Sequence, residues 1–106
     1  MKTYIVTYRT DDAPGEGHRD LGPVFSAIQS LGVFAHVMES VWMVCTTLTA
    51  QQLHTRLAPR FSGDDRLLIV ECGDAAEWRG IPLDTSVWLD NEFNAVRHLA
   101  PRRRFG

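Results

Sequence analysis

The clearest pattern in the chain is the strict alternation near its amino terminus. Tyr4, Val6 and Tyr8 fall on one side of an extended segment, and residues 3, 5 and 7 fall on the other. A period of two is typical of a β-strand, so residues 3–9 are predicted to form one. Residues 10–19 follow with aspartates, a proline and glycines, which indicates a loop.

A helical period replaces the alternation after this loop. Asp20 is placed to cap a helix, Pro23 suits its first turn, and Gly32 is suited to end it. Apolar residues recur at spacings that mark one helix face, which we expect to pack on a sheet. They are Leu21, Val24, Phe25, Ile28 and Leu31.

The middle of the chain predicts two strands and a second helix. Residues 33–40 and 41–48 are rich in strand-forming residues, with a corner at Glu39–Ser40. Thr49 opens a Thr-x-x-Gln capping box, which predicts a helix to about residue 59. Leu53 and Leu57 are its expected buried positions.

The last third of the chain predicts a strand and a final helix. Residues 62–65 read as a turn, and residues 66–72 as a strand whose unbroken apolar run favours a central or two-sided position in a sheet. Residues 73–83 are expected to be irregular or to contain a short extended piece. A helix is predicted from about Asp84 to Phe93, with an extension to Leu99 before Pro101 stops it.

The resulting order is β-α-β-β-α-β with an extra carboxy-terminal helix, which predicts an α+β ferredoxin-like domain with a four-stranded antiparallel sheet. We expect one such domain over residues 1–100, followed by a flexible basic tail over 101–106. Two helices cover one face of such a sheet. The other face, with Trp42, Met43 and Val44 as its expected apolar residues, then needs the extra helix or a second subunit, so a homodimer is predicted.

Composition narrows the possible partners. The net charge is −2 and the pI about 6.0, so any nucleic-acid contact must use a local basic patch. The amino terminus lacks the features of a signal peptide, and no apolar run is long enough for a membrane span. Cys45 and Cys72 are interpreted as buried reduced thiols of a cytoplasmic protein.

No strong catalytic or metal motif accompanies this pattern. The four histidines lack ligand-type spacing, the cysteines form no C-x-x-C, and no serine sits in a G-x-S-x-G turn. The pairs Asp11–Asp12 and Asp64–Asp65 offer oxygen ligands for a divalent cation, although adjacent acidic residues in loops more often form solvated turns.

Several sequence segments nevertheless resemble those of one family. The chain has a first strand of the form Y-x-V-x-Y, then Gly32, Glu39-Ser40-Val41-Trp42, LTAQQLHTRLAPRF and SGDD before RLLIV. Together these segments resemble the CRISPR-associated protein two family. The segment from Gly73 to Trp78 is closer to bacterial relatives found outside CRISPR loci. Virulence-associated protein D is a more distant relative of the same kind.

The resemblance implies a homodimer of ferredoxin-like subunits packed through their sheets. In that family an aspartate follows the tyrosine at the end of the first strand, and it is associated with magnesium-dependent nuclease activity. Tyr8 matches the tyrosine, but Arg9 stands where the aspartate should be. A guanidinium has no oxygen ligand for a cation and favours a phosphate, so Tyr8, Arg9 and Arg19 are candidate anion- or nucleic-acid-binding residues.

Three functions remain open on this basis. The first is a noncatalytic homodimeric relative of the family with a scaffold or regulatory role, with no cofactor, and with nucleic acid or another protein as partner. The second is a metal-dependent ribonuclease in which Asp11 or Asp12 holds magnesium. The third is a small-molecule-binding dimeric α/β barrel or sensor domain of the same strand order.

Overall fold

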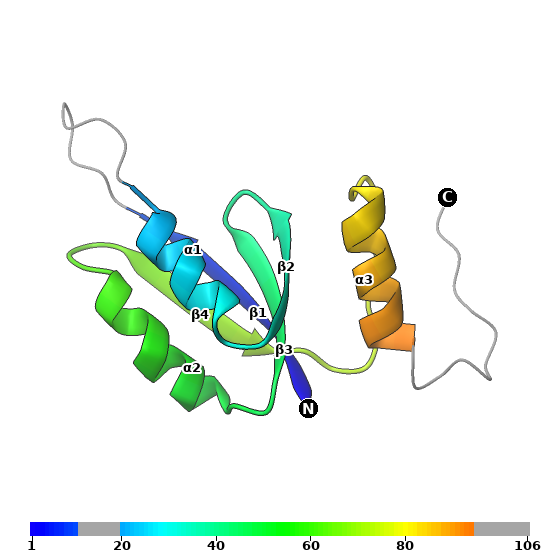
Figure 1. Cartoon of the computed structure of the whole chain (residues 1–106), viewed down its shortest axis with the longest axis horizontal. Helices are drawn as coiled ribbons and strands as arrows, with labels where there is room; N and C mark the ends of the chain where they lie inside the picture. The colour runs from blue at the N-terminus through cyan, green and yellow to red at the C-terminus, as the bar shows by residue number, and fades with distance from the viewer. Residues whose placement is uncertain (11–19, 95–106) are drawn as a thin grey trace.

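The computed structural model describes residues 1–10 and 20–94 (Figure 1). The predictions for Asp11, Asp12 and Arg19, for the helix beyond residue 94 and for the tail over 101–106 lie outside these ranges. The described part confirms the α+β class, with a four-stranded antiparallel sheet in the order β2-β3-β1-β4. The elements run in the order β1 Lys2–Arg9, α1 Gly22–Gln29, β2 Val33–Met38, β3 Val41–Thr46, α2 Ala50–Leu57, a 3-10 turn Ala58–Arg60, β4 Arg66–Glu71 and α3 Leu83–Asn94.

Strand β1 shows the alternation that the sequence predicts. Tyr4, Val6 and Tyr8 are buried against α1 and α2, while the residues between them are half-buried on the other face. β1 pairs with β3 on one side and with β4 on the other. It is therefore a central strand, and its period of two separates the two faces of the whole sheet.

Helices α1 and α2 lie on one face of the sheet and close the main core (Figure 1). Val24, Ile28 and Leu31 are buried as predicted, whereas Leu21 and Phe25 are half-buried at the edge of this core. Asp20 accepts a hydrogen bond from the Gly22 backbone N–H at 2.9 Å, but the N-cap position itself is Leu21. For α1, the sequence thus predicted which side of the helix is buried more accurately than it predicted the residue at which the helix begins.

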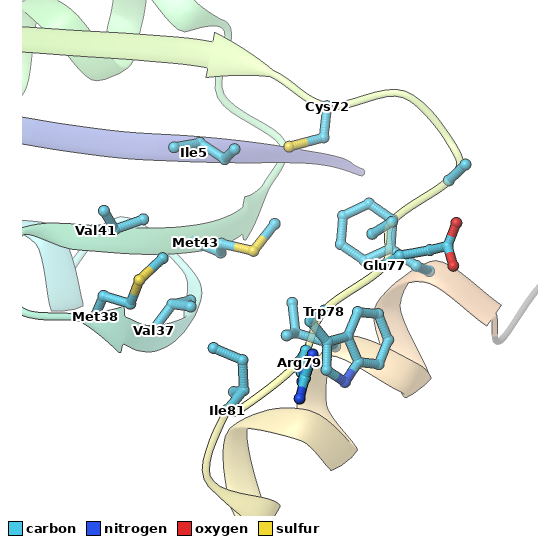
Figure 2. Close-up of a pocket in the computed structure, with 14 residues that line it drawn as sticks. Ile5, Val37, Met38, Val41, Met43, Cys72, Glu77, Trp78, Arg79 and Ile81 are labelled. Carbon is cyan, nitrogen blue, oxygen red and sulfur yellow. The ribbon is translucent and has the colours of Figure 1, made fainter. Parts of the chain in front are cut away.

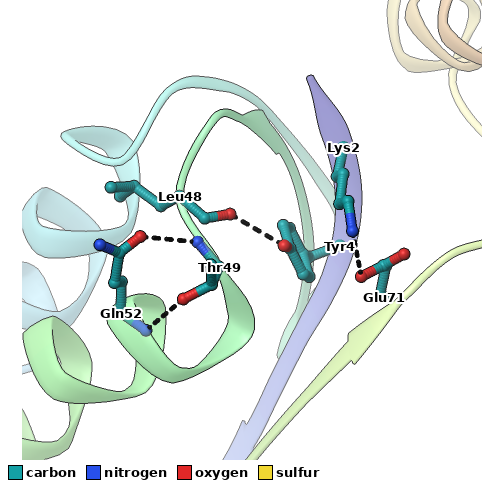
Figure 3. Close-up of polar contacts among 6 residues, drawn as sticks. All are labelled: Lys2, Tyr4, Leu48, Thr49, Gln52 and Glu71. Atoms are coloured by element: carbon teal, nitrogen blue, oxygen red, sulfur yellow. Dashed lines mark hydrogen bonds and ion pairs between the residues drawn. The ribbon is translucent and has the colours of Figure 1, made fainter.

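The start of α2 carries the predicted capping box (Figure 3). The Gln52 N–H donates to Thr49 Oγ1 at 3.1 Å, and the Thr49 N–H donates to Gln52 Oε1 at 2.8 Å. Just before this box, the Tyr4 hydroxyl donates to the Leu48 carbonyl oxygen at 2.8 Å. The cap satisfies backbone donors at the helix start, and the tyrosine ties the same segment to β1.

Strands β2 and β3 form a hairpin with Glu39–Ser40 at its corner, as predicted. The pairing shifts between His36 and Met38, so that Val37 is an extra residue in β2. Gly32 precedes the hairpin, and a Cβ atom there would lie 2.3 Å from the Cys45 carbonyl oxygen. Glycine is needed at this position because the backbone of β3 passes too close for any side chain.

Strand β4 decides between two predicted positions. The apolar run over residues 66–72 favoured a central or two-sided strand, and the central alternative is wrong, because β4 pairs with β1 alone and lies at the edge of the sheet. Leu67 and Ile69 pack on the helix-covered core, while Leu68 and Val70 point to the other face and are 57% and 44% exposed. The run is therefore apolar on both faces, and the described residues cover Leu67 and Ile69 more fully than Leu68 and Val70.

Helix α3 stands on the sheet face opposite α1 and α2 (Figure 1). Its Leu89 and Phe93 pack with Met43 of β3 in a second, smaller cluster. The sequence predicted that Trp42, Met43 and Val44 all lie on this face, and the prediction is wrong for Trp42 and Val44. Both belong to the helix-covered core, because alternation in β3 sends only Met43 and its like-facing neighbours toward α3.

Over residues 1–10 and 20–94, we find no helix with the length and apolar character needed to span a bilayer.

Candidate functional site

The sequence-predicted site at the end of β1 is divided between the two faces of the sheet. Tyr8 is 6% exposed, and its hydroxyl oxygen accepts a hydrogen bond from Trp42 Nε1 at 3.3 Å. Its ring lies 5.7 Å from that of Phe61, and burial raises the pKa of its hydroxyl. Arg9 is exposed and falls on the opposite face. The structure therefore places Tyr8 in the core and does not bring it onto one surface with Arg9.

Arg9 has a partner of the same charge that sequence reasoning missed. Arg66, the first residue of β4, is its direct cross-strand partner, and both side chains are exposed. Like charges placed directly opposite one another in a sheet repel. Within the described ranges neither guanidinium forms an ion pair with a carboxylate. Two adjacent guanidinium groups form a compact positive patch that suits a phosphate or a carboxylate.

The acidic residues beside this patch are engaged in a turn. Asp65 Oδ2 accepts a hydrogen bond from the Ser62 N–H at 3.0 Å, and the Asp65 N–H donates to the Ser62 carbonyl oxygen at 3.1 Å. Gly63 adopts a positive φ of 60° in this turn. The structure agrees with the interpretation of Asp64–Asp65 as turn residues, and Asp64 is exposed to solvent beside the two arginines.

A second candidate site lies beneath α3 (Figure 2). A pocket of about 360 Å³ opens between the sheet, the segment over residues 75–81 and α3. Its floor comes from β1, β2 and β3, and its walls from the segment that connects β4 to α3. The lining residues are Ile5, Val37, Met38, Val41, Met43, Cys72, Ala75, Ala76, Glu77, Trp78, Arg79, Ile81, Leu89 and Phe93.

Few polar groups reach this pocket. Glu77 and Arg79 are its charged lining residues, and Trp78 is fixed by a hydrogen bond from its Nε1 to Ser86 Oγ at 2.8 Å. Burial raises the pKa of the Cys72 thiol, and the same cause together with Glu92 raises the pKa of the Cys45 thiol nearby. Protonated thiols are poor nucleophiles and poor metal ligands, so both cysteines act here as small apolar residues.

Metal-ligating side chains are not gathered in the described part of the chain. No group of three or more His, Cys, Asp or Glu residues there could hold an ion. His36 instead stacks on Trp42 with ring centroids 3.9 Å apart, and its Nε2 lies 3.0 Å from the Glu39 carbonyl oxygen. The ribonuclease hypothesis depends on Asp11 and Asp12, which are outside the described residues.

Comparison of the chain with family models, with curated proteins and with solved structures finds no match.

Proposed function

We propose that this chain is a noncatalytic, homodimeric module of the ferredoxin-like kind that binds a phosphate-rich polymer through Arg9 and Arg66. The observation that carries the proposal is the cross-strand pairing of these two exposed arginines. Their mutual repulsion is relieved when an anion lies between them. Nucleic acid is such a polymer, because its regularly spaced phosphates match an arginine patch that occurs once on each subunit of the proposed dimer.

The ferredoxin-like arrangement and the kinship with the CRISPR-associated protein two family belong to this proposal. The order β-α-β-β-α-β before α3, with β1 and β3 in the middle of the sheet, supports the first. Arg9 supports a noncatalytic role, because the resemblance places an aspartate at this position in nuclease relatives. A cation held by carboxylates would be repelled by Arg9 and Arg66.

Dimerisation is supported by the uncovered part of the sheet. Leu68 and Val70 form an exposed apolar strip on the edge strand β4, on the face that α3 covers only in part. Exposed apolar strips on unpaired edges favour pairing with a second chain. Light scattering coupled to gel filtration is expected to give about twice the 12.0 kDa of one chain. A monomer at micromolar concentration would contradict this part of the proposal.

A cytoplasmic location is also part of the proposal, and the two cysteines support it. Both are free thiols. Cys45 pairs with Thr3 from one side of β1, and the Cys72 N–H bonds the Thr3 carbonyl oxygen from the other. Their backbones are thus two strand spacings apart, about 9.5 Å, which is beyond the reach of a disulfide bond.

Fluorescence anisotropy with a labelled 30-nucleotide single strand tests the binding. We expect affinity to fall steeply between 20 and 200 mM salt. The double variant Arg9→Ala/Arg66→Ala should bind at least about tenfold more weakly and lower the slope of log affinity against log salt by about 1.4 per chain, for two lost contacts. Arg56→Ala, an exposed arginine of α2, is the matched control and should leave binding nearly unchanged. Equal losses in both variants would refute the assignment.

The competing ribonuclease hypothesis is tested on the same protein. We expect labelled RNA and DNA to remain uncut with magnesium or manganese. Metal-stimulated cleavage that disappears in Asp11→Ala or Asp12→Ala would establish the enzyme instead.

A further inference from the structure

We propose that the pocket beneath α3 binds a small, planar, apolar molecule of one or two fused rings. This site is separate from the arginine patch. Its floor residue Ile5 precedes Arg9 by four positions on β1, a rise of about 13 Å. The inference therefore does not depend on nucleic-acid binding, and each site can be tested while the other is left intact.

The floor of the pocket exists because β2 is irregular. In a regular hairpin, Val37 and Met38 would point to opposite faces of the sheet. The extra residue in β2 leaves His36 paired with Trp42 on the helix-covered face, while Met38 pairs with Val41. Val37 and Met38 therefore both line the pocket, beside Met43 (Figure 2).

The walls are held in place by contacts within this chain. Leu89 and Phe93 lie one turn apart on α3 and pack on Met43. Trp78 projects from the connecting segment, and its Nε1 bond to Ser86 ties that segment to α3. Because floor and walls are already assembled, a ligand that enters need not order them first, which favours binding.

The size and chemistry of the pocket indicate the ligand class. A volume of about 360 Å³ is at the lower end of the range for small-molecule sites. An apolar cavity of about 150 Å³ is known to hold one benzene ring, so a two-ring molecule fits here. The sulfur atoms of Met38, Met43 and Cys72 line the same space. Thioether sulfur makes favourable contacts with aromatic rings and adapts to their shape.

Charge argues against a strongly ionic ligand. Glu77 and Arg79 are the two charged residues of the lining, and they carry opposite signs. They provide no net charge for a polyanion or a polycation, in contrast to the two arginines at the far end of β1. A neutral ring system, or one with a single polar substituent that reaches this pair, matches the lining best.

Isothermal titration calorimetry with 1-naphthol as the probe tests the proposal. For a ligand of this size we expect a dissociation constant on the order of 100 μM. Decahydro-1-naphthol, which keeps the two fused rings and the hydroxyl group but has no aromatic faces, should bind at least fivefold more weakly because it cannot stack against Trp78 or the sulfur atoms. Absence of binding up to 1 mM naphthol by folded protein would overturn the proposal.

Two matched variants locate the site. Met38 and Val33 are 57% and 52% exposed, both lie on the edge strand β2, and both fall on the face toward α3, but Val33 is outside the pocket lining. Met38→Trp should fill the pocket and weaken naphthol binding at least tenfold. Val33→Trp should leave the affinity within twofold of the original. Equal effects in the two variants would mean that naphthol binds the open sheet face rather than the pocket, and would overturn the assignment.

Measurements at two protein concentrations distinguish a pocket that is open to the ligand from one that a second copy of the chain fills. The naphthol affinity should be the same at 10 and 200 μM protein. An affinity that falls as the dimer forms would show that the partner chain fills the pocket, and the proposal would then be wrong.

Discussion

The two faces of the sheet are made from alternate residues of the same strands but differ in how completely they are packed. Trp42 and Met43 are neighbours in β3, and they lie in different clusters. On the face toward α1 and α2, the side chains of Tyr4, Val6, Trp42 and Val44 are at most 1% exposed. On the face toward α3, a pocket remains, and the indole N–H of Trp88 is buried without an acceptor in the described residues. One face is therefore closely packed, whereas the other retains free volume and exposed apolar surface.

The largest expected effect comes from a direct comparison within β3. Trp42→Ala should lower the free energy of unfolding by about 3–5 kcal/mol, because it removes a fully buried ring and leaves a cavity. Met43→Ala should cost about 2 kcal/mol, the low end for its class, because its surroundings already contain free volume. Urea denaturation of both variants measures the difference. Equal losses would show that the two faces are packed to the same extent.

Gly32 tests how tightly the helix-covered side is joined to β3. Gly32→Ala should destabilise the protein by about 1–3 kcal/mol, because the new Cβ atom meets the Cys45 carbonyl oxygen and the backbone must shift. Gly73→Ala is the control, since a Cβ atom there has no neighbour within 4 Å. Thermal unfolding of the pair should show a lower Tm for the first variant only.

The capping box tests α2, one of the two helices on the well-packed face. Thr49→Ala should cost about 1 kcal/mol, because the Gln52 N–H loses its acceptor and Gln52 loses the reciprocal arrangement. Thr49→Ser keeps the hydroxyl and should retain most of this stability. If the two variants unfold at the same urea concentration, the box contributes nothing measurable.

The smallest expected difference between the two faces concerns how the stability of the fold decreases at alkaline pH. Burial, with Glu92 as a further cause, raises the pKa of the Cys45 thiol on the α3 side, so the folded state holds this proton more tightly than the unfolded chain. The stability that results is complete below the ordinary thiol pKa of about 9 and is lost as pH rises through the raised value. Burial also raises the pKa of the Tyr8 hydroxyl on the other face, so its contribution to stability is lost in the same way as pH rises above about 10. Urea midpoints between pH 8 and 10 should therefore fall less in Cys45→Ala than in the parent protein.

Local patterns predicted the elements of the fold because their causes are local. Alternation over residues 3–9 predicted β1, and the Thr49–Gln52 spacing predicted the start of α2. The position of β4 at the edge of the sheet was not predictable in this way. Its apolar run has the composition of a two-sided strand, and the exposure of Leu68 and Val70 depends on what lies across the sheet rather than on β4 itself.

The candidate sites were harder to predict because both are formed by long-range pairing. Arg9 was recognisable from its place in the strand, but Arg66 becomes its neighbour only through the register between β1 and β4. The sequence did contain a signal for this pair, since Arg9 ends the first predicted strand and Arg66 begins the last one. The pocket draws residues from Ile5 to Phe93 and depends on the irregular pairing in β2, for which no sequence pattern gave a sign.

The central place of β1 also has a consequence for synthesis on the ribosome. β1 is made first, but one of its two neighbours, β4, begins only at residue 66. At about 5–20 residues per second, roughly 3–12 s pass between the emergence of these two strands. Throughout that interval one edge of β1 has no partner within its own chain, and exposed edges recruit strands from other chains. Ribosomes that stall before residue 66 should therefore yield chains that associate through β1, and slow translation of that segment should lower the yield of folded protein.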